Sequence, residues 1–80
     1  MILPSKHIDA SNALIGVGAD IISALEEPKS ASVVFYEVQN TRQESGLARI
    51  HFDWFLLALD FLYTLDAIQF KGGLLRIKNK

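Results

Sequence analysis

The stretch that decides the fold is FDWFLLALDFLYTL, which spans residues 52–65. Its length and its high content of Leu and Ala predict a helix, with Asp53 as the N-cap or as a first-turn acid. On a helical wheel its apolar arc covers about 260°, whereas an amphipathic surface helix needs little more than about 100°. We therefore expect this helix to have two apolar faces.

The two faces of this helix have different expected roles. The face that we expect to fill the core comprises Trp54, Leu57, Ala58, Phe61 and Leu65. The surplus face comprises Phe55, Leu56, Leu59 and Tyr63. In so small a chain, either another of its own helices or a different molecule must cover the surplus face, and interface hot spots favour large apolar side chains. We predict a protein interface that combines this face with Ile2 and Leu3 from an extended arm over residues 1–8.

Length and composition predict one small globular domain over residues 1–80. Half of the residues are apolar and 21% are charged, which is a globular composition rather than a disordered one. A domain of this length buries only about 60 to 65% of its unfolded surface, so stabilisation by a partner is expected. No apolar run reaches 18 residues and the first six residues lack the features of a signal peptide. We expect a cytoplasmic protein with no membrane partner.

Upstream of the central stretch, residues 11–26 have Leu, Ile and Val at helical spacing. Asp9 or Ser11 offers an N-cap for this first helix. Gly16 and Gly18 lie inside it, where each glycine costs about 1 kcal/mol relative to Ala. Two glycines so close together therefore predict a close backbone approach by a neighbouring element. A phosphate-binding loop is disfavoured because the third glycine and the preceding strand are missing.

A second helix follows the proline turn. Pro28 ends the first helix, since the residue before a proline is pushed out of the helical region, and Ser30 or Ser32 caps the second. We expect this helix to run to Gln43, although residues 33–36 read VVFY, which could form a strand on local preference alone. Residues 47–51 predict a short strand before the central helix.

The C-terminal residues 68–77 carry the strongest local signal. IQFK and LLRI flank Gly72-Gly73, and glycine tolerates the positive φ that two-residue hairpin turns require. The predicted pairs are Lys71 with Leu74, Phe70 with Leu75, and Ile68 with Ile77. We expect Phe70 and Leu75 to pack inward beneath the third helix. Three helices followed by this wing hairpin predict an α+β fold, a small winged helix-turn-helix domain.

Charge distribution argues against base reading by the third helix. A DNA-binding winged helix places this helix in the major groove, but residues 52–66 contain three acids and no basic or amide side chain. Residues 71–80, in contrast, hold four basic residues and no acid. These residues, which could contact a phosphate backbone or form a solvated strand edge, are Lys71, Arg76, Lys78 and Lys80. The alternative function is therefore a small DNA-binding regulator that uses its wing and basic tail.

Enzymatic readings have little support in the sequence. There is no cysteine, and no nucleophile elbow, paired-carboxylate motif, phosphate loop or metal-ligand spacing. His7 and His51 are too few and too scattered for a zinc site. His51 and Asp53 are two residues apart and predict a hydrogen-bonding arrangement at a helix start rather than a catalytic dyad. We expect a noncatalytic protein without catalytic, cofactor or metal residues.

Several motifs together are similar to one known family. They are MILPSKHI at 1–8, GVGADII at 16–22, LEEPK at 25–29, and FDWF with ALD within 52–60. The sequence resembles the middle component, of the type numbered six, of bacterial ABC-three-component systems. These systems encode an SMC-like or ABC ATPase, a small middle subunit and an effector, and include the Lamassu type of anti-phage defence. The resemblance spans almost the whole chain, although residues 37–50 contain no motif typical of the family.

The resemblance implies a noncatalytic winged-helix subunit that sits on the ATPase and couples it to the effector. The surplus apolar surface and this implied role lead to the same interpretation. We predict an adaptor subunit of a defence complex that bridges the ATPase and the effector through apolar contacts. The expected partners also include a second copy of the chain and, only indirectly through the complex, DNA.

Overall fold

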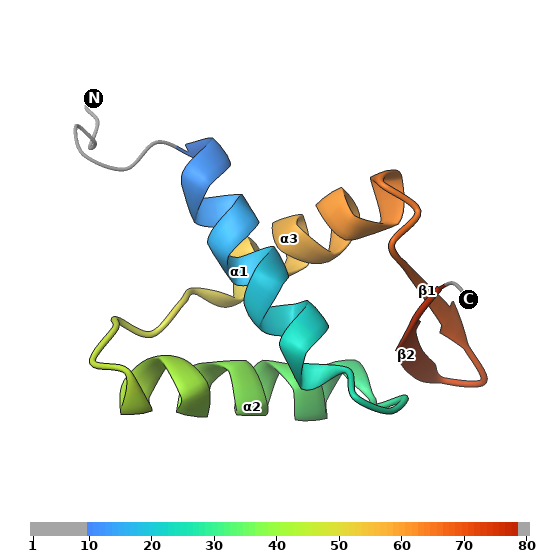
Figure 1. Cartoon of the computed structure of the whole chain (residues 1–80), viewed down its shortest axis with the longest axis horizontal. Helices are drawn as coiled ribbons and strands as arrows, with labels where there is room; N and C mark the ends of the chain where they lie inside the picture. Colours follow the sequence, from blue (N-terminus) through green and yellow to red (C-terminus); the bar gives the residue numbers. More distant parts are fainter. Residues whose placement is uncertain (1–9, 79–80) are drawn as a thin grey trace.

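The computed structural model describes residues 10–78, in which three helices precede a two-stranded antiparallel hairpin (Figure 1). The elements are α1 (Ala10–Ala24), α2 (Ala31–Glu44), α3 (Phe52–Thr64), β1 (Ile68–Lys71) and β2 (Leu74–Ile77). Helix α1 packs against both other helices, and the hairpin follows the end of α3. The predicted α+β class is confirmed, and the arrangement is compatible with a winged helix. The predicted arm over residues 1–8 lies outside the described residues.

The helix starts are fixed by local hydrogen bonds. Ser30 is the N-cap of α2, and its Oγ accepts the N–H of Val33 at 3.3 Å. His51 caps α3, and its Nδ1 accepts the N–H of Asp53 at 3.2 Å. The predicted helix-start role of these two residues is confirmed, with Asp53 as the first-turn acid. For α1, the candidate cap Ser11 lies within the helix, and the other candidate, Asp9, lies outside the described residues.

The two glycines of α1 differ in their surroundings. Gly18 is buried, and a Cβ added there would lie 3.5 Å from Cδ2 of Leu62 on α3, an ordinary van der Waals contact. A Cβ on Gly16 would meet nothing within 4 Å. The predicted close approach therefore applies to Gly18 alone, and it brings a side chain rather than a backbone against the helix.

The connection between α2 and α3 is not a strand, so the short strand predicted over residues 47–51 is wrong. The buried side chain of Gln39 satisfies the backbone of Ile50 instead: its Nε2 donates to the carbonyl at 2.8 Å, and its Oε1 accepts the N–H at 3.0 Å. Arg42 Nε donates to the carbonyl of Ala48 at 2.9 Å. Side chains of α2 thus replace the neighbouring strand that an extended segment would need.

The end of α3 adopts a Schellman motif without glycine. Asp66 has a left-handed φ of 64°, and the N–H of Ala67 donates to the carbonyl of Leu62 at 2.9 Å. A non-glycine residue in this conformation costs about 1 kcal/mol or more. The Asp66 carboxylate accepts a hydrogen bond from Nζ of Lys78 at 2.8 Å, which ties the end of β2 to the end of α3.

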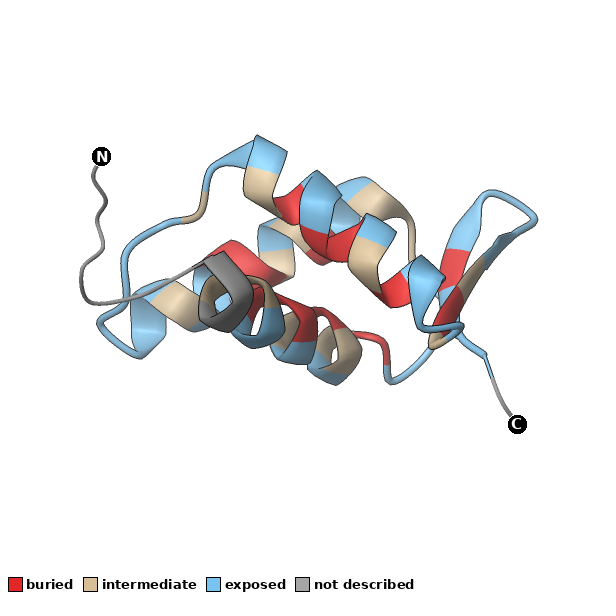
Figure 2. Ribbon diagram, turned by 90° about the horizontal axis from the view of Figure 1, so that it is seen from above, coloured by how far each residue is buried: buried red, intermediate tan, exposed pale blue. Residues whose placement is uncertain are grey.

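The hairpin has the predicted register. Its pairs are Ile68 with Ile77, Gln69 with Arg76, Phe70 with Leu75, and Lys71 with Leu74. Gly72 and Gly73 have φ values of 62° and 82°, as a type I′ turn requires. The inward packing predicted for Phe70 is wrong, because its side chain is 56% exposed whereas that of Leu75 is 2% exposed. The hairpin extends beyond the helices (Figure 2), so they cover only part of its inner face.

Lys29 joins the α1–α2 turn to the hairpin and to α2. Its N–H donates to the carbonyl of Leu75 at 3.0 Å, and its carbonyl accepts the Leu75 N–H at 2.7 Å. Its Nζ donates to Glu37 at 2.7 Å, and this hydrogen bond is the main cause of a raised pKa of Lys29. While Glu37 is ionised, the contribution of Lys29 to stability is therefore full below pH 10.5, the ordinary lysine value, and is lost as the pH rises through the higher pKa of the folded state.

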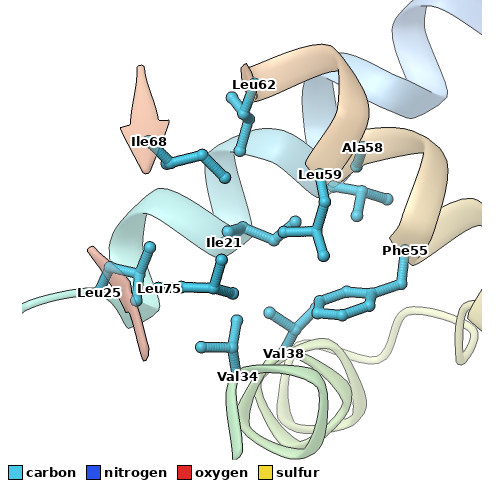
Figure 3. Packing of buried hydrophobic residues seen from close by; sticks show 11 residues of the cluster. Ile21, Leu25, Val34, Val38, Phe55, Ala58, Leu59, Leu62, Ile68 and Leu75 are labelled. Carbon is cyan, nitrogen blue, oxygen red and sulfur yellow. The ribbon is translucent and has the colours of Figure 1, made fainter. Parts of the chain in front are cut away.

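One hydrophobic core receives side chains from all three helices and both strands (Figure 3). Its buried members are Val17, Ile21, Leu25, Val34, Val38, Phe55, Ala58, Leu59, Leu62, Ile68 and Leu75. α2 contributes only Val34 and Val38 to this set, at the i, i+4 spacing that puts them on one face. In Figure 3 both point into the core, and Val38 lies beside the ring of Phe55. Among the described residues, no helix is long and apolar enough to cross a bilayer.

Candidate protein interface on α3

The buried side of α3 is one arc of the helix. Its members are Phe55, Ala58, Leu59 and Leu62, which lie within about 100° on the helical wheel. The predicted surplus face is thereby corrected, because Phe55 and Leu59 belong to the core and are not available to a partner. The predicted core face is also corrected, because Leu57 and Leu65 are exposed. The arc that faces α1 and α2 includes Phe55, whose ring fills the space beside Val38 (Figure 3).

A second apolar surface remains on α3 beside the buried arc. Phe52, Leu56 and Tyr63 are 50%, 46% and 42% exposed and lie within about 40° of one another on the wheel. We call these three residues the α3 stripe. Leu56 and Tyr63 were in the predicted interface, whereas Phe52 was missed, although its spacing of i, i+4 and i+11 with the other two places it on the same face.

Aromatic contacts hold one end of the stripe in place. The ring of Phe35 on α2 meets Phe52 edge-on, with centroids 5.2 Å apart, and Phe55 at 5.0 Å. Phe52 also stacks on Phe55 at 6.0 Å. Edge-to-face and offset-stacked pairs of this kind are favourable beyond the area that they bury. The exposed ring of Phe52 is thus fixed by the core before any partner arrives, and such preorganisation lowers the entropy cost of binding.

Hydrogen bonds between a side chain of α2 and the backbone hold the start of the same helix. The side chain of Gln39 holds both hydrogen-bonding groups of Ile50, the residue before the cap His51. Because α3 begins directly after this pair, Gln39 holds the backbone from which the first turn and Phe52 extend. A buried amide with both of its functional atoms bonded stabilises one arrangement of the connection.

The exposed charges of α3 are all negative. Asp53 and Asp60 are exposed, and no Lys or Arg occurs in Phe52–Thr64. Asp53 lies 3.8 Å from Nδ1 of its neighbour His51. Asp60 makes no ion pair within residues 10–78, and the residues three and four positions away on the helix are all uncharged. A surface of this sign repels phosphate groups.

The residues predicted to contact nucleic acid are spread along the hairpin. Lys71 and Arg76 are exposed and take part in no ion pair with another described residue. Lys78 is engaged by Asp66, and Lys80 lies outside the described residues, as do the interface residues Ile2 and Leu3. Arg76 also lines an open cleft of about 430 Å³ together with two acids, Glu26 and Glu27. Of the three described positions, only Lys71 and Arg76 are therefore outside an ion pair, and Arg76 lies in a cleft that acids also line.

The described residues contain no cluster of side chains suited to binding a metal ion. Between residues 10 and 78, no group of three or more His, Asp or Glu side chains lies close enough together to hold a metal ion.

In a comparison with known families, residues 3–78 match the model described as ABC-three component (ABC-3C) system Middle Component 6. The chain belongs to this family. The middle components are one part of a multi-subunit system, so partner components are implied for this chain. Neither the curated proteins nor the solved structures that were compared give a match.

Proposed function

We propose that this Middle Component 6 chain is a noncatalytic adaptor that binds the ATPase of its ABC-3C system and couples it to the effector. The observation that carries the proposal is the α3 stripe, an exposed apolar surface on a helix whose charges are all acidic. Exposed aromatic side chains held rigidly by a core are typical of protein–protein hot spots. The proposal includes an SMC-like ATPase of the Lamassu type, a winged-helix fold for the adaptor, and contact with DNA only through the assembled complex.

Two matched pairs of residues test this proposal. Leu56 and Leu57 are adjacent, similarly exposed leucines, but only Leu56 belongs to the stripe. Tyr63 and Tyr36 are exposed tyrosines, but Tyr36 lies on α2. We expect Leu56→Ser and Tyr63→Ser each to lower the affinity for the ATPase by about thirtyfold, the effect of losing about 2 kcal/mol. Leu57→Ser and Tyr36→Ser are the controls and should bind as the wild type does.

The measurement is copurification of the ATPase and the effector with the tagged chain, with circular dichroism on the same preparations. Loss of the ATPase from the two stripe variants, with unchanged spectra, supports the proposal. Full recovery of both partners with all four variants contradicts it, as does equal loss with stripe and control variants.

The second candidate is a DNA-binding regulator, which the exposed Lys71 and Arg76 favour. In that case the isolated chain binds duplex DNA with a steep salt dependence, and changing both residues to Ala flattens the salt dependence. The adaptor proposal expects only weak binding. Tight, sequence-selective binding that persists without the four basic residues of the C-terminal segment contradicts the adaptor proposal.

A further inference from the structure

The stripe carries an acid whose position restricts what can cover it. On the helical wheel, Asp60 lies about 40° from Leu56 and about 60° from Tyr63, so it is at the edge of the α3 stripe. It is exposed, and no ion pair with another residue of 10–78 compensates its charge. A partner surface that covers Leu56 and extends past this edge of the stripe also removes water from the Asp60 carboxylate.

Loss of water from the Asp60 carboxylate restricts which groups the partner can place opposite it. Removing a carboxylate from water without a partner is strongly unfavourable. A Lys or Arg placed against it compensates for the lost hydration through a charge-assisted hydrogen bond. Nothing in the local helix requires an acid here: Asp60 is in the helix interior, where Asp is a poor helix former, and its neighbours at i±4 are Leu56 and Thr64. Asp53, in contrast, lies in the first turn and stabilises the helix N-terminus by itself.

From these observations we infer that the α3 stripe binds a protein surface with an apolar centre and a Lys or Arg that pairs with Asp60. This inference rests on the proposed adaptor function, and it names the chemistry of the ATPase surface that the stripe contacts. The apolar residues supply the affinity, and the ion pair at the edge fixes the orientation and selects the partner.

The same charge argues against the other two occupants. If a second copy bound through the same face, the two α3 helices would place Asp53 and Asp60 of one chain near those of the other, and like charges at an interface are strongly unfavourable. Duplex DNA would bring phosphates against the same two acids. A cationic protein surface is therefore the occupant that the observed charges favour.

The test measures the affinity of the full chain for the purified ATPase component at low and at high salt. Asp60→Asn removes the charge and keeps the shape, Asp60→Lys reverses the charge, and Glu44→Gln neutralises an exposed acid of α2 as the control. We expect Asp60→Asn to weaken binding at least about tenfold and to reduce its salt dependence. Asp60→Lys should weaken binding further, and Glu44→Gln should bind as the wild type does.

Two outcomes overturn the inference without affecting the proposed function. In the first, Leu56→Ser releases the ATPase but Asp60→Asn binds as well as the wild type or better, so that no cation faces Asp60. In the second, Asp60→Asn weakens binding no more than Glu44→Gln does, so that only the net charge matters.

Two further outcomes identify a different occupant and also overturn the inference. If light scattering shows that the isolated chain is a dimer, and that the dimer is lost in Leu56→Ser and tightened in Asp60→Asn, a second copy covers the stripe. If Asp60→Asn raises the affinity for duplex DNA while ATPase binding is unchanged, the face is a nucleic-acid surface. Failure of the wild-type chain to bind the ATPase at all contradicts the proposed function itself.

Discussion

Two neighbouring sides of α3 carry similar residues but differ in burial. Phe55 and Leu59 are buried in the core, whereas Phe52 and Leu56 are about half exposed on the adjacent stripe. Both pairs consist of one Phe and one Leu at the spacing i, i+4, and they are only about 60° apart on the wheel. The difference comes from what lies opposite each pair: the core residues of α1 and α2 cover the first, and nothing in residues 10–78 covers the second completely. Hydrophobicity alone therefore identifies apolar surface, but not which part of it the chain itself covers.

The largest effect on stability is expected on the buried side of α3. Phe55→Ala should lower the free energy of unfolding by about 3 to 5 kcal/mol, because it removes a fully buried ring from the centre of the core. Leu56→Ala, one residue along, should change it by less than about 0.5 kcal/mol, as expected for a surface position. Urea unfolding monitored by circular dichroism measures both values. Similar losses in the two variants would mean that the assigned buried arc is wrong.

The hairpin offers a second test of the same contrast. Phe70 and Leu75 are cross-strand partners, but only Leu75 is buried. We expect Leu75→Ala to cost about 2 to 5 kcal/mol and Phe70→Ala less than about 1 kcal/mol. Thermal unfolding of the two variants provides the measurement. A larger loss for Phe70→Ala would restore the inward packing predicted from the sequence and contradict the observed exposure.

Gln39 gives an intermediate effect that sharpens the comparison, because it positions the start of the stripe. Gln39→Ala leaves the N–H and the carbonyl of Ile50 without their partner, and loss of a partially buried hydrogen-bonding partner costs about 1 to 3 kcal/mol. Gln43→Ala, an exposed position on the same helix, is the control. Amide hydrogen exchange should speed up at residues 50–53 in Gln39→Ala only. Unchanged protection of these amides would show that Gln39 does not hold the start of α3.

The smallest expected effect concerns the two glycines of α1. Gly16→Ala should raise the free energy of unfolding by about 0.5 to 1 kcal/mol, because the site is open and alanine is the better helix former. Gly18→Ala should gain less, since its Cβ would contact Leu62 at 3.5 Å. The melting temperatures of the two variants give the order. A larger gain at Gly18 would mean that the contact with α3 is looser than the distance indicates.

The candidate site was only partly accessible from the sequence. The apolar excess of α3 and the absence of basic residues along it are sequence properties, and they led to Leu56 and Tyr63. The assignment of Phe55 and Leu59 to the same face failed because a wheel with an apolar arc of about 260° does not indicate which 100° will be buried. Phe52 was missed although its spacing with Leu56 and Tyr63 places it on the same face of the helix; its contact with Phe35 of α2, in contrast, is visible only in the tertiary structure.

What the sequence determined by itself is the local structure: a serine cap for α2, the hydrogen-bonded start of α3 at His51 and Asp53, and the hairpin turn at Gly72-Gly73. Each depends on side chains or φ angles within a few residues, so the information is contiguous in the chain. The tertiary structure alone decided three features: the buried arc of α3, the exposure of Phe70, and the replacement of the strand over residues 47–51 by contacts from Gln39. These depend on packing between segments that are distant in the sequence, where burial follows from the shape of the opposing surface rather than from the hydrophobicity of the residue.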